Sequence, residues 1–319
     1  MNHLPRCALA LMLGLLAGAA VAGQLSRDIA AKETAAAIEA PGAPANVTPL
    51  PPGTKVERDI KYGPDDRNLL DVVSPGPVSG SARPVLVFVH GGAFVGGDKQ
   101  MPGKPYYDNV MMAAIADGFV GVNMTYRLAP GSPWPAGAED VGAAVRWVAD
   151  NIAARGGDPA RIYLMGHSSG AVHVATYLAH REFQGPHGDL LAGAILISGF
   201  YDLTSMELTD QRRAYFGSDA STYKDRSSLD GLIASRTPLL VLRAETEPEV
   251  FAQQFDELRD RLCASPRGCV QTGVLPQHRH ANAVQSIDGR GSALFRQLVA
   301  FVNGGKSPEP VEKTDRAKP

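Results

Sequence analysis

The chain has 319 residues, a formal net charge of −2 at pH 7, 44% hydrophobic residues and 20% charged residues. This composition predicts a single α/β domain with one large core. A charge so close to zero argues against nucleic acid or an anionic membrane surface as a partner. No internal repeat is visible in the sequence.

Residues 1–22 have the organisation of a secretory signal peptide. Arg6 lies in a short polar start, an apolar run follows over 7–20, and A-V-A at 20–22 supplies a cleavage motif. The apolar run is too short and too rich in Gly and Ala to indicate a membrane span. The sequence predicts cleavage before Gly23 and a periplasmic or secreted protein, with an uncleaved anchor as the alternative.

Three further segments follow the signal peptide. Residues 23–55 are rich in Ala and Pro and predict a flexible leader. Residues 56–304 carry the alternating pattern of an α/β domain, and residues 305–319 have the composition of a disordered tail.

Strand-like and helix-like segments alternate through the domain, which predicts a mostly parallel eight-stranded sheet with helices on both faces. The predicted strands are 56–61, 68–73, 84–89, 119–125, 161–165, 193–198, 238–243 and 270–275. The predicted helices are 105–117, 138–154, 169–181, 249–262 and 291–303. The first two strands are expected to pair antiparallel.

The stretch 199–236 is too long for an ordinary connection between two elements. It carries an unusual share of large apolar side chains, namely Phe200, Tyr201, Leu203, Met206, Tyr215 and Phe216. Insertions of this kind often close over an active site. We therefore expect a small cap-like insertion here, with Tyr201 as a possible pocket residue.

Residues 166–170 read G-H-S-S-G and follow a strand-like apolar run. A strand that turns sharply into a helix at Gly-x-Ser-x-Gly is how α/β-hydrolases expose a nucleophilic serine. After Ser168, apolar residues recur at helical spacing, as this arrangement requires. The motif predicts acyl transfer with Ser168 as the nucleophile.

A second motif, H-G-G-A at 90–93, follows the apolar strand 84–89. Ester hydrolysis passes through a tetrahedral oxyanion, which needs backbone N–H donors already aimed at it. The prediction is an oxyanion hole formed by the N–H groups of Gly91, Gly92 and Ser169. His90 and Phe94 are expected to shape the adjoining pocket.

These motifs resemble those of the α/β-hydrolases in the hormone-sensitive-lipase and kynurenine-formamidase-like esterase groups. The resemblance spans about residues 56–304 and implies a serine esterase with a triad in the order Ser, acid, His. Ala93 stands where many members have a third glycine. The residues that carry the resemblance are H-G-G-A-F-V-G-G-D-K (90–99), Y-R-L-A-P (126–130), G-G-D-P-A-R-I (156–162) and G-H-S-S-G-A (166–171), with weaker matches at 62–72 and 278–280.

The same resemblance assigns the other two members of the triad. Similar esterases carry Gly-Glu-x-Asp after the relevant strand, which maps the acid onto Glu247, with Glu245, Asp202 and Glu249 as alternatives. Their Gly-His-Asn-His pattern corresponds to Q-H-R-H here and maps the base onto His280.

Cysteine usage agrees with export. Cleavage of the signal peptide leaves only Cys263 and Cys269, which are six positions apart and predict a disulfide. His278 and His280 have no third ligand at a metal-binding spacing, so no metal and no cofactor is expected.

The expected substrate is a small, neutral, partly apolar acyl or aryl ester, because no basic cluster marks a phosphate or several carboxylates. An amidase such as an aryl formamidase could use the same triad, and a non-catalytic binding protein could share the fold. The sequence makes no prediction of oligomeric state.

Overall fold

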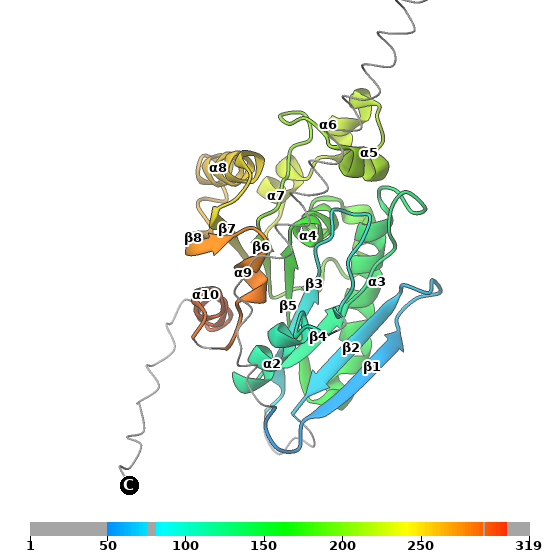
Figure 1. Cartoon of the computed structure of the whole chain (residues 1–319), viewed down its shortest axis with the longest axis vertical. Helices are drawn as coiled ribbons and strands as arrows, with labels where there is room; N and C mark the ends of the chain where they lie inside the picture. The colour runs from blue at the N-terminus through cyan, green and yellow to red at the C-terminus, as the bar shows by residue number, and fades with distance from the viewer. Residues whose placement is uncertain (1–49, 76–80, 102, 290, 305–319) are drawn as a thin grey trace, which may run out of the picture. The chain divides into compact units, whose positions relative to one another are not determined.

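The computed structural model describes residues 50–75, 81–101, 103–289 and 291–304 (Figure 1). The chain divides into two units, 1–42 and 43–319, and all described residues belong to the second. The predicted signal peptide, residues 23–49 of the predicted leader, and the predicted tail lie outside the described residues, so these remain predictions.

The described strands form one eight-stranded sheet in the order β1-β2-β4-β3-β5-β6-β7-β8 (Figure 1). β2 pairs antiparallel with β1 and with β4, and all other pairs are parallel. The predicted mostly parallel sheet with an antiparallel start is confirmed. The strands are β1 (Lys55–Lys61), β2 (Leu69–Ser74), β3 (Arg83–Val89), β4 (Val120–Met124), β5 (Gly157–His167), β6 (Gly193–Ile197), β7 (Leu239–Thr246) and β8 (Gln271–Arg279).

Each of the five predicted helices is present, with ends shifted by a few residues. Four shorter helices, α5, α6, α7 and α9, were not predicted, since segments of four to seven residues show too few turns for a periodicity. The helices are α2 (Asp108–Ala116), α3 (Ala136–Asn151), α4 (Ser169–Ala179), α5 (Asp210–Phe216), α6 (Tyr223–Arg226), α7 (Leu229–Ala234), α8 (Glu249–Cys263), α9 (Asn282–Gln285) and α10 (Ala293–Val302).

Both faces of the sheet are buried, as β3 illustrates. Val85, Val87 and Val89 point into a core shared with α3, α4 and α8, whereas Leu86 and Phe88 point into a second core shared with α2 and α10 (Figure 1). Successive side chains of a strand alternate between faces, so a strand covered on both sides must be apolar at every position. Residues 85–89 therefore form a continuous apolar run in the sequence.

The segment 199–236 packs against the rest of the domain through buried apolar side chains. Phe200, Tyr215 and Phe216 are buried with Phe94 in a third apolar cluster. The later part, α7, is buried with α3 and α4 in the first core through residues such as Leu232. The segment is therefore tied at one end to the loop after β3 and at the other to the main domain.

Cys263 and Cys269 form a disulfide, as the sequence predicts. The bridge joins the end of α8 to the turn before β8, the strand that leads to His280. Among the described helices, none combines the length and the apolar character needed to cross a membrane.

Candidate active site

Ser168 occupies the turn between β5 and α4. Its backbone lies at φ 54° and ψ −125°, a conformation that costs a non-glycine residue about 1–3 kcal/mol. The turn is held in place because the Ser168 N–H donates to the carbonyl of Ile197 in β6 at 2.9 Å, and the Ser168 carbonyl accepts from Val172 at 3.2 Å. The serine is thus fixed at the carboxyl edge of the sheet.

The two motif glycines are required by close backbone approach. A Cβ on Gly170 would lie 2.2 Å from the carbonyl oxygen of Val89 and 2.5 Å from that of His90. A Cβ on Gly166 would lie 2.5 Å from the carbonyl oxygen of Gly170. Neither position can hold a side chain, so the helix can start against the end of β3 only with glycine at both.

The structure brings Ser168, His280 and Glu247 together. Nε2 of His280 is 3.0 Å from Oγ of Ser168, and Nδ1 is 3.1 Å from Oε2 of Glu247. Since a carboxylate can only accept, Nδ1 carries the proton and Nε2 is left to accept from the serine hydroxyl. The Glu247 side chain is fully buried, whereas that of His280 is 19% exposed.

The sheet explains why residues so far apart in sequence meet. Ser168 follows β5, Glu247 follows β7 and His280 follows β8. β5, β6, β7 and β8 are parallel neighbours, so their carboxyl ends lie along one edge. Each of the three side chains comes from the first residue after its strand.

The alternative acids are engaged elsewhere. Glu245 accepts from the N–H of Gln277 at 2.6 Å. Asp202 accepts from the backbone and hydroxyl of Thr204 at 2.8 and 2.7 Å. Glu249 accepts from Gln253 one turn along α8, at 2.8 Å. Of the four candidates, Glu247 is the one hydrogen-bonded to His280.

Two residues whose contribution sequence analysis missed support the His280 ring and backbone. Nε2 of His167 donates to the His280 carbonyl at 2.8 Å. The ring of Phe251, on α8, lies 4.2 Å from the His280 ring, measured between centroids. His278 is turned away and bonds the Pro276 carbonyl and Ser286. His167 lies inside the Gly-x-Ser-x-Gly motif, but nothing in the sequence indicates this hydrogen bond.

The predicted oxyanion loop passes directly against the serine. A Cβ on Gly91 would lie 3.1 Å from Cβ of Ser168, and one on Gly92 would lie 2.1 Å from the carbonyl oxygen of Gly96. Gly92 has φ +143°, and Ala93 and Phe94 follow at φ 51° and 70°. Gly91 and Ser169 therefore flank Ser168, the positions that the predicted oxyanion hole needs.

Residues from two other motifs hold this loop through side-chain and backbone hydrogen bonds. The Tyr126 hydroxyl donates to the His90 carbonyl at 2.9 Å, and the Ala129 N–H donates to the Phe94 carbonyl at 2.9 Å. Arg67 donates to the carbonyls of Gly97 at 2.8 Å and Tyr126 at 2.7 Å. The motifs at 62–72, 90–99 and 126–130, separate in sequence, thus form one hydrogen-bonded unit.

The three possible pocket residues are almost fully buried. His90 is inaccessible and stacks on Tyr126, and Phe94 is 2% exposed and stacks on Tyr215. Tyr201 is 2% exposed. Its burial, and to a smaller extent the nearby Glu247 carboxylate, raise the pKa of its hydroxyl. These residues pack beneath the site instead of presenting their side chains to solvent.

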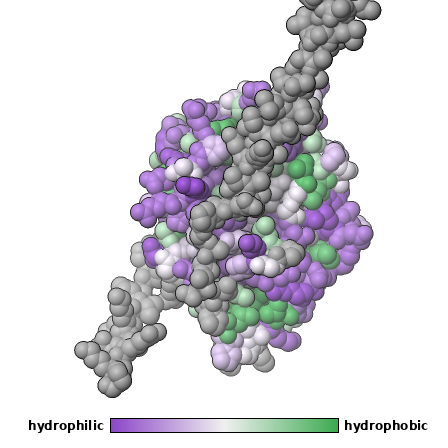
Figure 2. Space-filling view, viewed as in Figure 1, coloured by the Kyte–Doolittle hydropathy of each residue, from purple (hydrophilic) through white to green (hydrophobic). Residues whose placement is uncertain are grey.

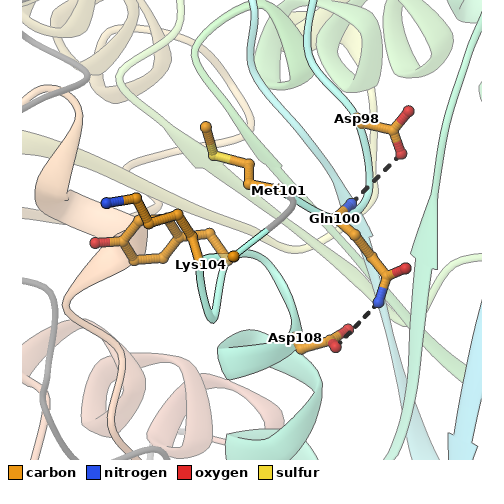
Figure 3. Close-up of a pocket in the computed structure, with 7 residues that line it drawn as sticks. Asp98, Gln100, Met101, Lys104 and Asp108 are labelled. Atoms are coloured by element: carbon orange, nitrogen blue, oxygen red, sulfur yellow. Dashed lines mark hydrogen bonds between the residues drawn. The ribbon is translucent and has the colours of Figure 1, made fainter.

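A cavity of about 460 Å³ lies in the segment that follows the oxyanion loop. Asp98, Gln100 and Asp108 line one side and Met101 and Lys104 the other (Figure 3). Of its two carboxylates, Asp108 is bonded to Arg58 and Gln100, and Asp98 is paired with Arg67 at 3.6 Å. None of the lining residues belongs to the serine, histidine and glutamate cluster. Within the described ranges, no group of three or more His, Cys, Asp or Glu residues could hold a metal ion.

The overall fold has many solved counterparts. Esterase B from Lactobacillus rhamnosis superposes with a TM-score of 0.67, covering 88% of this chain and 93% of esterase B at 17% identity. At this identity the likeness concerns the fold, and that fold is the α/β-hydrolase fold predicted from the sequence.

The chain belongs to the BD-FAE family, which matches residues 70–262. Esterase LipQ from Mycobacterium tuberculosis is 30% identical over 70% of this chain and 56% of LipQ. Carboxylesterase NlhH from the same species is 40% identical over 34% of each chain. The chain thus spans between about a third and just over half of the length of these curated relatives.

Three buried histidines near the site predict a pH-dependent stability. Burial lowers the pKa of His90 to about 4, and those of His167 and His173 to about 3. In the unfolded chain each titrates near 6.5, so below that pH the unfolded state binds more protons. Each should then remove stability with a slope that rises from about 0.7 kcal/mol per pH unit near pH 6.5 to about 1.4 kcal/mol per pH unit near pH 5.

Urea unfolding at pH 7.5, 6 and 5 measures this loss. Both ring nitrogens of His173 are buried without a hydrogen-bond partner among the described residues. The variant His173→Leu should therefore lose about a third of the pH dependence. An equal slope in the variant and the parent would contradict this explanation.

Proposed function

We propose that the protein is a serine carboxylesterase that hydrolyses small acyl or aryl esters through an acyl-enzyme on Ser168. One observation carries the proposal: the His280 imidazole bridges Oγ of Ser168 at 3.0 Å and Oε2 of Glu247 at 3.1 Å. A base must be within hydrogen-bond reach of the proton that it removes and must itself be oriented by a third group. Both conditions are met in the resting structure.

In the first step, Nε2 of His280 takes the hydroxyl proton as Oγ of Ser168 attacks the ester carbonyl carbon. The carbonyl π electrons move to oxygen, and N–H groups of Gly91, Gly92 and Ser169 hold the resulting oxyanion. Glu247 stabilises the imidazolium that forms. Collapse of the intermediate breaks the bond to the alcohol, which leaves with the proton from His280.

In the second step, water takes the place of the serine hydroxyl. His280 removes a proton from water as its oxygen attacks the acyl carbon, and the same N–H groups hold the second oxyanion. Collapse returns the proton to Oγ of Ser168 and releases the carboxylic acid. His167, whose pKa is lowered to about 3 by burial and by His280, stays neutral beside the imidazolium.

The names of the relatives favour ester over amide hydrolysis, since LipQ is an esterase and NlhH a carboxylesterase. A small substrate agrees with the surface. The exposed large hydrophobic residues of the described chain are Val56, Val95 and Val274, and Figure 2 shows apolar residues in separate patches. A lipase that binds long chains would need a broader apolar surface at its site.

Ser168→Ala should abolish turnover of p-nitrophenyl acetate, with a loss on the order of 10⁴-fold or more in kcat. The loss has a direct cause, because among the described residues Ser168 supplies the hydroxyl that is hydrogen-bonded to Nε2 of His280. Ser221→Ala, at an exposed serine, is the control and should keep full activity. Near-parental turnover in Ser168→Ala would overturn the proposed function.

The identity of the acid is tested by comparing Glu247→Gln with Glu245→Gln. An amide at 247 can hold the imidazole in the wrong tautomer and cannot stabilise its charge, so kcat should fall on the order of 10³-fold. Glu245→Gln keeps an oxygen that can accept from the Gln277 N–H and removes only the negative charge, so it should change kcat by less than about threefold. A larger loss for Glu245→Gln would reassign the acid.

We also propose that the protein is exported after cleavage before Gly23. The predicted signal peptide motivates this, and the disulfide between Cys263 and Cys269 supports it, because such bridges persist in oxidising compartments. N-terminal sequencing of the protein recovered outside the cytoplasm should start at Gly23. Protein found only inside the cell with residues 1–22 retained would contradict export.

A further inference from the structure

Arg212 is a partly buried cation in the segment between β6 and β7. Its Cζ lies 4.8 Å from the ring centroid of Phe200 and 5.5 Å from that of Phe251. The backbone is fixed because the Arg212 N–H donates to the Thr209 hydroxyl that caps α5. A guanidinium packs readily on aromatic faces, since it is planar and weakly hydrated. These two ring contacts fix the position of the charged guanidinium group.

The guanidinium has no anionic partner among the described residues. Arg58 and Arg127 are paired with Asp108 and Asp140 and have raised pKa values, with the ion pairs outweighing burial. Arg267 is half-buried without an acidic partner among the described residues, but it donates to three backbone carbonyls. At Arg212 burial alone acts and lowers the pKa to about 10. The side chain is still protonated at neutral pH, and no described residue accepts a hydrogen bond from its guanidinium.

The two rings under Arg212 connect it to the proposed catalytic groups. Phe251 lies 4.2 Å from the His280 ring, and Phe200 lies 5.9 Å from Phe94, which follows the oxyanion loop. Arg212 is therefore one ring away from the base on one side and two rings away from the oxyanion loop on the other. A substrate that extends from Ser168 along these rings would meet the positive charge of Arg212.

We propose that Arg212 recognises a carboxylate on the substrate, so that the preferred substrates are esters that carry one free carboxylate. This inference rests on the proposed function and specifies its substrate class. A carboxylate matches the fork of N–H donors on a guanidinium and would supply the acceptor that Arg212 lacks. The neutral substrate expected from the sequence followed from the absence of a basic cluster. A single arginine that is positioned by aromatic rings from other segments cannot be recognised as a basic cluster in the sequence.

Two substrate pairs test the proposal, each differing only by carboxylate against carboxamide. 4-Acetoxybenzoate and 4-acetoxybenzamide place the group on the leaving alcohol, and monomethyl adipate and methyl adipamate place it on the acyl chain. The wild-type protein should show at least a tenfold higher kcat/KM for the carboxylate member of one pair. The pair that responds identifies the side of the ester that faces Arg212.

Arg212→Gln should erase that preference through a KM about tenfold or more higher for the carboxylate member, with kcat little changed. Turnover of the carboxamide member should stay within about threefold, which also shows that the variant is folded. Arg212→Lys keeps the charge without the fork and should restore part of the preference. Arg213→Gln removes a charge from the same helix, at a residue paired with Asp210, and should leave the preference intact.

Two results would overturn the inference: equal kcat/KM within both wild-type pairs, or an equal loss on both members in Arg212→Gln, which would make Arg212 a structural residue only. These outcomes are separable from a failure of the proposed function. If Ser168→Ala is inactive on the carboxamide members while the wild type shows no preference, only the role of Arg212 is wrong. If Ser168→Ala keeps its turnover, the proposed function itself is wrong.

Discussion

The site depends on how closely α4 approaches the end of β3. Gly170, in the first turn of α4, lies so near the carbonyls of Val89 and His90 that a Cβ there would come within 2.2 Å of one of them. This approach leaves no room for a gradual connection from β5, and Ser168 takes the strained backbone at φ 54°. The strain is held by the hydrogen bond to Ile197 and by the parallel pairing of Val89 with Gly166. The same geometry that strains the serine also points it out of the sheet.

The remaining groups are brought to the serine by rigid elements rather than by one another. Glu247 and His280 follow the ends of β7 and β8, and the oxyanion loop follows the end of β3. The loop is fixed by Tyr126 from the segment after β4 and, through Gly97, by Arg67 from the turn before β2. A base and an acid placed in this way need little reorganisation when charge develops, which is the condition for electrostatic stabilisation of a transition state.

The sequence was informative where one residue type is physically required. Three features leave a local pattern: glycines at close backbone contacts, apolar strands covered on both faces, and a serine between a strand and a helix. The sheet and the position of Ser168 in the turn between β5 and α4 could therefore be predicted. The pairing of Glu247 with His280 could be inferred only from resemblance, because Glu245 and Glu249 stand beside Glu247 with the same chemistry. The structure separates them by hydrogen-bond partner. Arg212, Phe251 and the His167 hydrogen bond to His280 depend on packing between distant segments, which no local pattern records.

The central claim is that Ser168 becomes covalently acylated, and trapping that state tests it most directly. The purified protein would be treated with diethyl 4-nitrophenyl phosphate, which leaves a stable phosphoryl group on an activated serine, and then digested and mapped by mass spectrometry. The account predicts one diethylphosphoryl group on the peptide that contains Ser168, and none after Ser168→Ala. A label on another residue, or an unlabelled Ser168 in a protein that still hydrolyses esters, would contradict it.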